Sequence, residues 1–186
     1  MSVPLNILCQ SPVSEGMTPS DAVGHTVDLA IEAERLGYHR FWVAEHHSDK
    51  ALASGAPEVL VATIAARTST LRVGSGGVLL PYYQPFKVAE QFNLLEALFP
   101  GRIDLGLGRS GGSERHAPHA LGLKPERMAA EGAFGAIDEL LSWLGKGGDD
   151  RPFPDTFASP QIETSAEPWV LGTSPASATF AGERGL

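Results

Sequence analysis

Short apolar runs alternate with longer stretches of helical periodicity along the 186 residues of the chain. Five runs have the length of buried strands, and each precedes a segment whose apolar residues recur every three to four positions. The expected strands are 3–9, 40–44, 71–81, 102–108 and 168–172. Because successive βα units place their strands in parallel, the sequence predicts an α/β fold, either a barrel or a doubly wound sheet.

The segments between the strands carry helix signals. The first helix has Thr18 as its N-cap, Pro19 at its first position and Gly37 after its end. The second, over 57–68, is apolar on almost every side, which predicts burial on two faces, by the core and by another subunit. Further helices are expected over 85–99, after Pro125 with buried Ile137, Leu140, Leu141 and Leu144, and over 175–184.

Residues 145–167 differ in composition from the rest of the chain. They are rich in Gly, Pro, Asp and Thr and show no apolar periodicity, which predicts a long loop before the fifth strand, with a short hairpin around 153–162. We expect residues 1–186 to form a single domain. A complete (β/α)8 barrel needs about 250 residues, and five βα units fall well short of that.

Charge and cysteine content limit the classes of partner. The net charge is −8 and no basic cluster is present, which argues against a nucleic-acid or anionic-membrane surface. Cys9 is the one cysteine, so no disulfide framework is expected. The charge leaves a small molecule or a protein as the expected partner, and the single cysteine favours a reducing, cytoplasmic setting. No signal-peptide pattern or apolar stretch of membrane length is apparent, so we expect a soluble, untargeted protein.

Two glycine-rich segments follow or interrupt strands. "GLGRSG" at 106–111 has the G-x-G-x-x-G spacing of a dinucleotide site, but no helical pattern begins after it, which argues against that class. There Arg109 either donates to a phosphate or is solvated above a tight turn. Gly76 and Gly77 interrupt the third strand, and they indicate either a bulge or the close approach of another group.

Hydroxyl residues mark the start of the last helix. Thr173, Ser174 and Ser177 lie at the junction between the fifth strand and that helix. Free amides and hydroxyls at a helix N-terminus bind anions, phosphate above all, and serine and threonine are also ordinary N-caps. The sequence leaves both roles open.

Glu45, His46 and His47 end the second strand abruptly. Adjacent histidines on an extended segment point in opposite directions, and no further metal-ligand pattern accompanies them, so we expect no metal site. Residues just past the carboxyl ends of parallel strands form the active site of α/β enzymes. Four features have such positions, and they favour a catalytic site at one rim, with His47 in a structural role: Glu45 with His46, Gly76 with Gly77, Arg109, and Thr173 with Ser174.

With these residues in place, the sequence resembles the bacterial luciferase-like monooxygenases, flavin-dependent enzymes on a (β/α)8 TIM barrel. The matching stretches are "FWVAEHHS", "LRVGSGGVLLPYYQPFKVAEQFNLLEALFPGRIDLGLGRSGG" and "WVLGTSPASA". Taken together they cover most of the chain in the order of the family. The resemblance implies an incomplete TIM barrel of about five of the eight βα units.

The resemblance also implies roles for single residues. His46 matches the histidine beside the flavin ring, and Glu45 precedes it in the same motif. Gly76 and Gly77 match a pair joined by a cis peptide against the ring. The positions that match those holding the phosphate of FMN are Arg109, Thr173, Ser174 and Ser177.

In this family, reduced FMN supplied by a separate NAD(P)H flavin reductase reacts with oxygen, and a small organic substrate is oxygenated. We therefore expect a homodimeric FMN-dependent monooxygenase whose partners are a small-molecule substrate and a flavin reductase. Two alternatives stay open: a non-catalytic flavin-binding or degenerate short homologue, and, with less support, a metal-dependent hydrolase that uses His46 and His47.

Overall fold

A computed structural model of the chain describes residues 3–109, 116–123, 125–127, 129–148, 153 and 155–186. Its five strands form one sheet in chain order, and each neighbouring pair is parallel. They are β1 (Asn6–Cys9), β2 (Arg40–Val43), β3 (Arg72–Leu79), β4 (Ile103–Gly108) and β5 (Glu167–Leu171). The predicted α/β fold with consecutive parallel strands is confirmed, and this strand order is that of an incomplete barrel.

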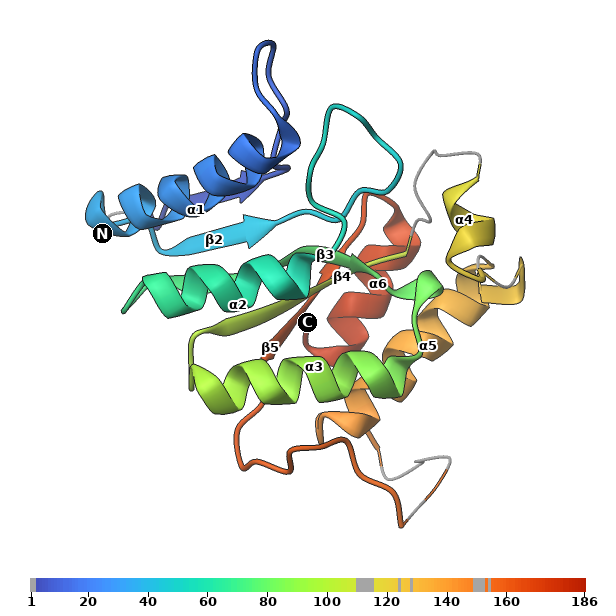
Figure 1. Ribbon diagram of the computed structural model, residues 1–186. Helices are drawn as coiled ribbons and strands as arrows, with labels where there is room; N and C mark the ends of the chain where they lie inside the picture. Colours follow the sequence, from blue (N-terminus) through green and yellow to red (C-terminus); the bar gives the residue numbers. More distant parts are fainter. Residues whose placement is uncertain (1–2, 110–115, 124, 128, 149–152, 154) are drawn as a thin grey trace.

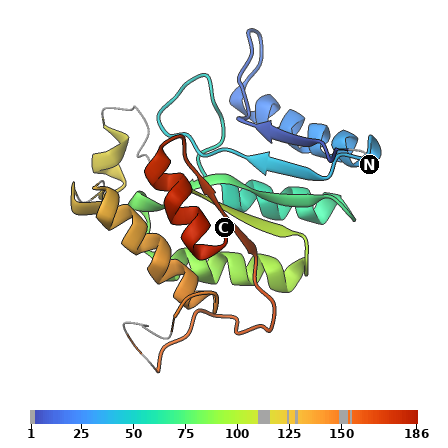
Figure 2. The ribbon, with the colours of Figure 1, turned by 180° about the vertical axis from the view of Figure 1, so that it is seen from behind.

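Helices connect the strands. They are α1 (Pro19–Arg35), α2 (Pro57–Arg67), α3 (Pro85–Leu98), α4 (Ala117–Ala120), α5 (Ala130–Trp143) and α6 (Pro175–Arg184), with short 3-10 turns η1 (Leu80–Tyr82) and η2 (Pro125–Arg127). Figure 1 shows α1, α2 and α3 one below another across the sheet, and Figure 2 brings α6 to the front. The short helix α4 was not predicted, because its four residues are too few to show a helical period.

The ends of α1 follow the local signals in its sequence. The Thr18 hydroxyl accepts the backbone N–H of Asp21 at 3.1 Å, and the Asp21 carboxylate accepts the backbone N–H of Thr18 at 2.9 Å. This reciprocal capping box satisfies two amides that the first turn leaves unpaired. After the helix, Gly37 has a φ of +79°, a left-handed conformation that glycine adopts at low cost.

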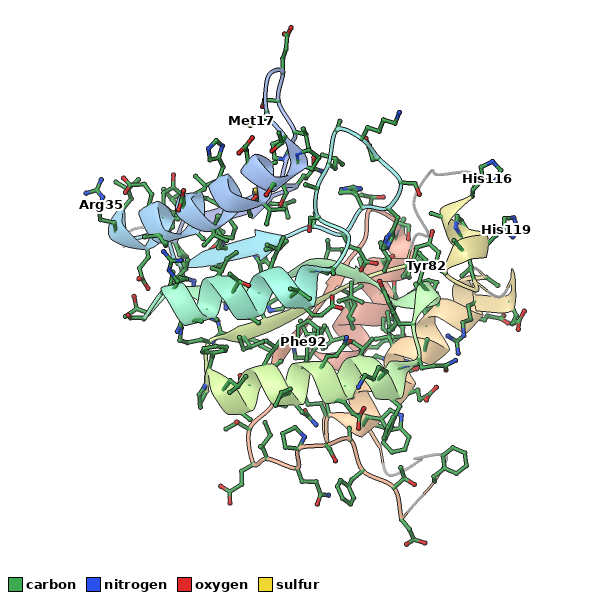
Figure 3. All side chains as sticks on the ribbon, in the orientation of Figure 1. Met17, Arg35, Tyr82, Phe92, His116 and His119 are labelled. Carbon is green, nitrogen blue, oxygen red and sulfur yellow. The ribbon has the colours of Figure 1, made fainter. Side chains whose placement is uncertain are left out.

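The core lies between the sheet and the helices that cover it. Phe41 and Leu105 on the strands and Phe92 on α3 are fully buried, and Figure 3 marks Phe92. The stripe predicted after Pro125 is also buried, with Ile137 and Leu140 at 1% and 0% exposure. Burying a side chain of this size stabilises the fold by about 1.5–3 kcal/mol.

One face of α2 is buried and the other is exposed in the single chain. Leu60, Val61 and Ile64 face the core, whereas Val59 is 60% exposed. The predicted burial of one face of α2 by the core is confirmed. The predicted burial of its other face by another subunit stays a prediction.

The prediction of a short hairpin around residues 153–162 is wrong. Among the described residues of this segment no strand is formed, and the chain follows turns and bends until β5 begins at Glu167. Phe153 and Phe157 are 65% and 48% exposed. Since these apolar side chains pack on no partner strand, the segment lacks the cross-strand contacts that stabilise a hairpin.

None of the helices in the described part of the chain has both the length and the apolar character needed to cross a membrane.

Glu34 fastens the end of α1 to the turn before β3. Its Oε1 accepts the backbone N–H groups of Ser69, Thr70 and Leu71 at 2.6–2.9 Å. Partial burial alone would raise the pKa of Glu34, but these hydrogen bonds outweigh it and lower the pKa to about 2. A carboxylate whose pKa falls on folding stabilises the protein above its unfolded pKa, and this contribution is lost as the pH falls from about 5 towards 2.

We expect Glu34→Gln to lower the free energy of unfolding at pH 7 by about 1 kcal/mol, a modest figure because solvent screens a partly exposed group. Urea denaturation at pH 7 and pH 3 measures it, and the difference from the parent protein should shrink at pH 3. Glu32→Gln is the matched control, since Glu32 lies on the same helix but pairs only with the exposed Arg35. A wild-type stability that does not fall between pH 5 and 3 relative to Glu34→Gln would contradict this role.

Candidate active site

A cleft of about 400 Å³ opens at the carboxyl ends of the strands, and its wall is formed by residues of β1, β3, β4 and β5 together with the loop that follows β2. It brings together six of the eight predicted site residues: Glu45, His46, Gly76, Gly77, Arg109 and Thr173. A hollow of about 530 Å³ lies at the opposite ends of β4 and β5, and no predicted site residue lines it. The cleft of about 400 Å³ is therefore the candidate site, because it contains most of the predicted site residues.

His46 lies in the loop that follows β2. Its backbone N–H donates to the Ser54 carbonyl at 2.8 Å, and the Ser54 hydroxyl donates to the Ala44 carbonyl at 2.6 Å. The two bonds close the loop on itself and fix the backbone at His46. The half-buried imidazole has no hydrogen-bond partner among the described residues, so both ring nitrogens are available to a bound molecule.

Glu45 has no exposed side-chain surface, so it contributes to the cleft wall through its backbone. Its Oε1 lies 2.6 Å from His47 Nε2 and accepts the Tyr83 hydroxyl at 2.7 Å. Its Oε2 accepts the Leu79 backbone N–H at 2.8 Å. Burial raises the pKa of Tyr83, and the hydrogen bond to Glu45 raises it further, so the phenol stays protonated as a donor.

Gly76 and Gly77 are joined by a cis peptide bond, as the family resemblance implied. The register of β3 against β4 also shifts between Ser75 and Val78, so the alternative reading as a strand irregularity holds as well. A Cβ on Gly76 would lie 2.9 Å from Trp42 Cβ, and one on Gly77 would lie 2.8 Å from the Gly106 carbonyl oxygen. Neighbouring strands therefore require glycine here.

Arg109 follows β4 and reaches towards α6. Its Nη2 donates to the Ser174 hydroxyl at 3.2 Å, and its guanidinium lies 4.7 Å from the centre of the Phe134 ring. The Nε atom is buried without a hydrogen-bond partner among the described residues. A buried guanidinium N–H costs free energy until an acceptor fills the position, and an anion in the cleft would supply one.

The start of α6 carries the predicted hydroxyls. Ser174 is the N-cap, and its Oγ accepts the Ser177 backbone N–H at 3.2 Å and lies 3.0 Å from Ser177 Oγ. Ser177 is buried beneath Gly172, where a Cβ would overlap its side chain. Thr173 alone of the three hydroxyls lines the cleft. Ser174 touches Arg109 behind the wall, and Ser177 supports Ser174.

Three residues of this site were not singled out from the sequence: Tyr83, Phe134 and Gly172. Tyr83 lies in "PYYQP", a turn with no chemical signature, and its contact with Glu45 joins positions 38 residues apart. Phe134 has the spacing of a helical core position, and its ring also stacks on Phe180 at 4.3 Å. Of the three, only Gly172 had a local signal, because it ends a strand directly before a helix N-cap.

The part of the chain that the structure describes contains no group of three His, Cys, Asp or Glu residues able to hold a metal ion. His47 is instead bonded to Glu45 and packs edge-on against Tyr82, with ring centres 5.5 Å apart. Nothing in the described site supports the metal-dependent hydrolase.

Comparisons with known proteins identify relatives of the chain. The family model for luciferase-like monooxygenases matches residues 3–186. N-acetyl-S-alkylcysteine monooxygenase of Bacillus subtilis is 45% identical over 98% of this chain and 54% of its own length. The chain thus spans about half the length of the curated relatives it matches.

Solved structures show the same fold. The crystal structure of apo-MsnO8 is 43% identical and superposes with a TM-score of 0.87 over 98% of this chain and 53% of that one. The oxygenating component of 3,6-diketocamphane monooxygenase from Pseudomonas putida, solved in complex with FMN, is 20% identical with a TM-score of 0.78 over 100% and 56%. The family model matches nearly the whole chain, and two of the relatives are more than 40% identical over 98% of it, so the chain belongs to the family of luciferase-like monooxygenases.

Proposed function

We propose that the chain is the FMN-binding part of a monooxygenase that uses reduced FMN and oxygen on a small organic substrate. The observation that carries the proposal is the convergence of His46, the Gly76–Gly77 pair and Arg109 on one cleft. An apolar wall, a free imidazole and an anion donor are the three features that a flavin with its phosphate would need.

The residues present fit a flavin phosphate. The buried Nε of Arg109 lacks an acceptor among the described residues, and the exposed Thr173 lines the same cleft. The N-terminus of α6 adds the partial positive charge of a helix end. An arginine fork at this position favours FMN over a deazaflavin.

When bound, reduced FMN would supply the electrons that activate oxygen towards the substrate. The protein contributes binding, orientation and exclusion of water. Leu8, Leu79 and Leu171 line the cleft and would keep water from the reacting atoms. His46 would accept or donate a proton at Nδ1 or Nε2, since neither nitrogen has a partner among the described residues.

Partners and location complete the proposal. A separate NAD(P)H flavin reductase would supply reduced FMN, and the protein would act in the cytoplasm. The name of the Bacillus subtilis relative makes small thioethers the first substrate class to test. Homodimerisation through α2 and α3 would cover the exposed side chains of Val59, Leu94 and Leu98, and analytical ultracentrifugation tests it.

Comparing FMN with riboflavin tests the phosphate site directly. We expect FMN to bind at least about 30-fold more tightly, because the phosphate gains charge-assisted hydrogen bonds that riboflavin cannot form. Quenching of flavin fluorescence measures both dissociation constants on the same preparation. Equal affinity for the two flavins would exclude a phosphate site at Arg109.

Oxygen consumption separates an enzyme from a flavin-binding homologue without turnover. The assay couples the purified chain to a flavin reductase with NAD(P)H, and His46→Ala is the site variant. We expect substrate-dependent oxygen consumption that His46→Ala abolishes. Tight FMN binding without any such consumption would select the non-catalytic alternative.

A further inference from the structure

The Glu45 carboxylate joins three separate segments of the chain. Its partners are His47 in the loop after β2, the Leu79 backbone N–H at the end of β3, and the Tyr83 hydroxyl just before α3. The three distances fall between 2.6 and 2.8 Å, and the side chain has no exposed surface. Both oxygens of Glu45 are thus hydrogen-bonded within the protein.

These hydrogen bonds bear on what Glu45 can do. A general acid or base must come within hydrogen-bond reach of the atom it serves. The two oxygens of Glu45 already have three protein partners, and no surface of the side chain faces the cleft. A direct part in proton transfer to a bound molecule would require the hydrogen bonds of Glu45 to break.

The segments that Glu45 joins carry His46 and the Gly76–Gly77 pair, and a bound flavin would depend on the distance between them. His46 is the next residue along the chain, and Leu79 lies two positions after Gly77. One carboxylate therefore connects the segment that carries the free imidazole to the segment that carries the cis glycine pair. Each of its oxygens holds one side of that connection, Oε1 through His47 and Oε2 through Leu79.

Further contacts brace the two partners that come from side chains. The His47 ring packs edge-on against Tyr82, which Figure 3 marks beyond the end of β3. The Tyr83 carbonyl accepts Arg127 Nη1 at 2.6 Å, so the Tyr83 backbone is held from η2 as well. Buried hydrogen-bond networks that are fully satisfied in this way fix a single arrangement.

We propose that Glu45 is a positioning residue, which sets the placement of His46 relative to Gly76 and Gly77. The proposal rests on the proposed function, because it gives Glu45 a part in the same flavin site. Glu45 acts through its neighbours and touches neither substrate nor cofactor. A shift of about 1 Å in such a placement is enough to cost a large part of the rate.

A stabilising carboxylate with no influence on the site is the competing role, and a matched control separates the two. Glu96 on α3 is also buried, at 2% exposure, and accepts the Gly101 backbone N–H at 2.7 Å. It lies at the opposite end of the sheet, beside the hollow of about 530 Å³. Glu96→Gln therefore alters a buried carboxylate without touching the cleft.

The test uses nitrogen-15 NMR of the ligand-free chain, followed by titration with FMN. In Glu45→Gln we expect changed ring resonances for His46 and His47, a changed amide resonance for Gly77, and FMN affinity lower by about tenfold. Tyr83→Phe removes one donor and keeps the carboxylate, so it should shift the same resonances to a smaller extent and remain folded if Glu45→Gln does not. Glu96→Gln should leave these resonances and the affinity unchanged.

Unchanged His46 and Gly77 resonances in both Glu45→Gln and Tyr83→Phe would overturn the positioning role. So would equal changes in Glu96→Gln, since the effect would then be one of global stability. Failure of the wild-type chain to bind FMN would count against the proposed function instead, because the resonances of the ligand-free protein are read independently of the flavin.

Discussion

Replacing Arg109 with alanine is expected to lower the affinity for FMN about 100-fold. Among the residues that the structure describes, the guanidinium is the one cation that lines the cleft, and its buried Nε has no acceptor there. Two charge-assisted hydrogen bonds to a phosphate, each contributing about 1.5–3 kcal/mol, correspond to at least that factor. Fluorescence titration with FMN measures the loss, and riboflavin affinity should change little.

Two further variants test the reason for this loss. Arg109→Lys keeps the charge but lacks the planar fork, so we expect an intermediate affinity. Arg35→Ala is the control, because Arg35 lies at the far end of α1 from the cleft (Figure 3) and pairs with Glu32 on the same helix. If Arg109→Ala binds FMN as the parent protein does, the phosphate is held elsewhere.

Arg109 is also oriented by an aromatic column that links the cleft to the last helix. Its guanidinium lies over Phe134, Phe134 stacks on Phe180, and the Arg184 guanidinium lies 3.8 Å from the centre of the Phe180 ring. Such cation–π contacts contribute about 0.5–2 kcal/mol each. The phosphate donor is thus held by packing between α5 and α6, and it does not depend on its own loop alone.

The regular elements were predictable because burial leaves a periodic pattern. The Thr18 cap, the Gly37 stop and the buried stripe at Ile137 and Leu140 are local signals, and the structure contains all of them. The contact of Tyr83 with Glu45 was not predictable, because it depends on how two strands align. Periodicity reports which face of an element is buried and does not say which residue lies opposite.

In the candidate site, too, the local features were predictable from the sequence and the contacts between separate segments were not. Position after a strand end was enough to gather His46 and Arg109, because parallel strands end at one edge of a sheet. Gly76 was predicted to follow a strand end but lies inside β3, which continues to Leu79. Position alone could not predict the role of Glu45. Its carboxylate is held out of the cleft by hydrogen bonds to three partners on separate segments, and these contacts cannot be read from the sequence. The prediction of a hairpin failed for a related reason, because the segment has no apolar periodicity and its exposed Phe153 and Phe157 have no partner strand among the described residues.

The glycines of "GLG" in β4 have two different roles, and alanine substitution should separate them. A Cβ on Gly106 would overlap the backbone carbonyl of Ser75 on β3 and lie 3.0 Å from Leu171 Cδ1. Backbone in the middle of a sheet cannot withdraw without breaking the ladder. We expect Gly106→Ala to lower the free energy of unfolding by about 3 kcal/mol, at the upper end of overpacking effects, as measured by urea denaturation.

Gly108→Ala on the same strand is the matched control. A Cβ there would meet the flexible end of Leu79 at 3.2 Å and the Val78 carbonyl only at 3.5 Å, so we expect a loss below about 1 kcal/mol. Equal losses in the two variants would mean that the β3–β4 pairing relaxes around Gly106. A large difference would show that Gly106 is required for the close approach of two strands, whereas Gly108 lines the cleft where a ligand would lie.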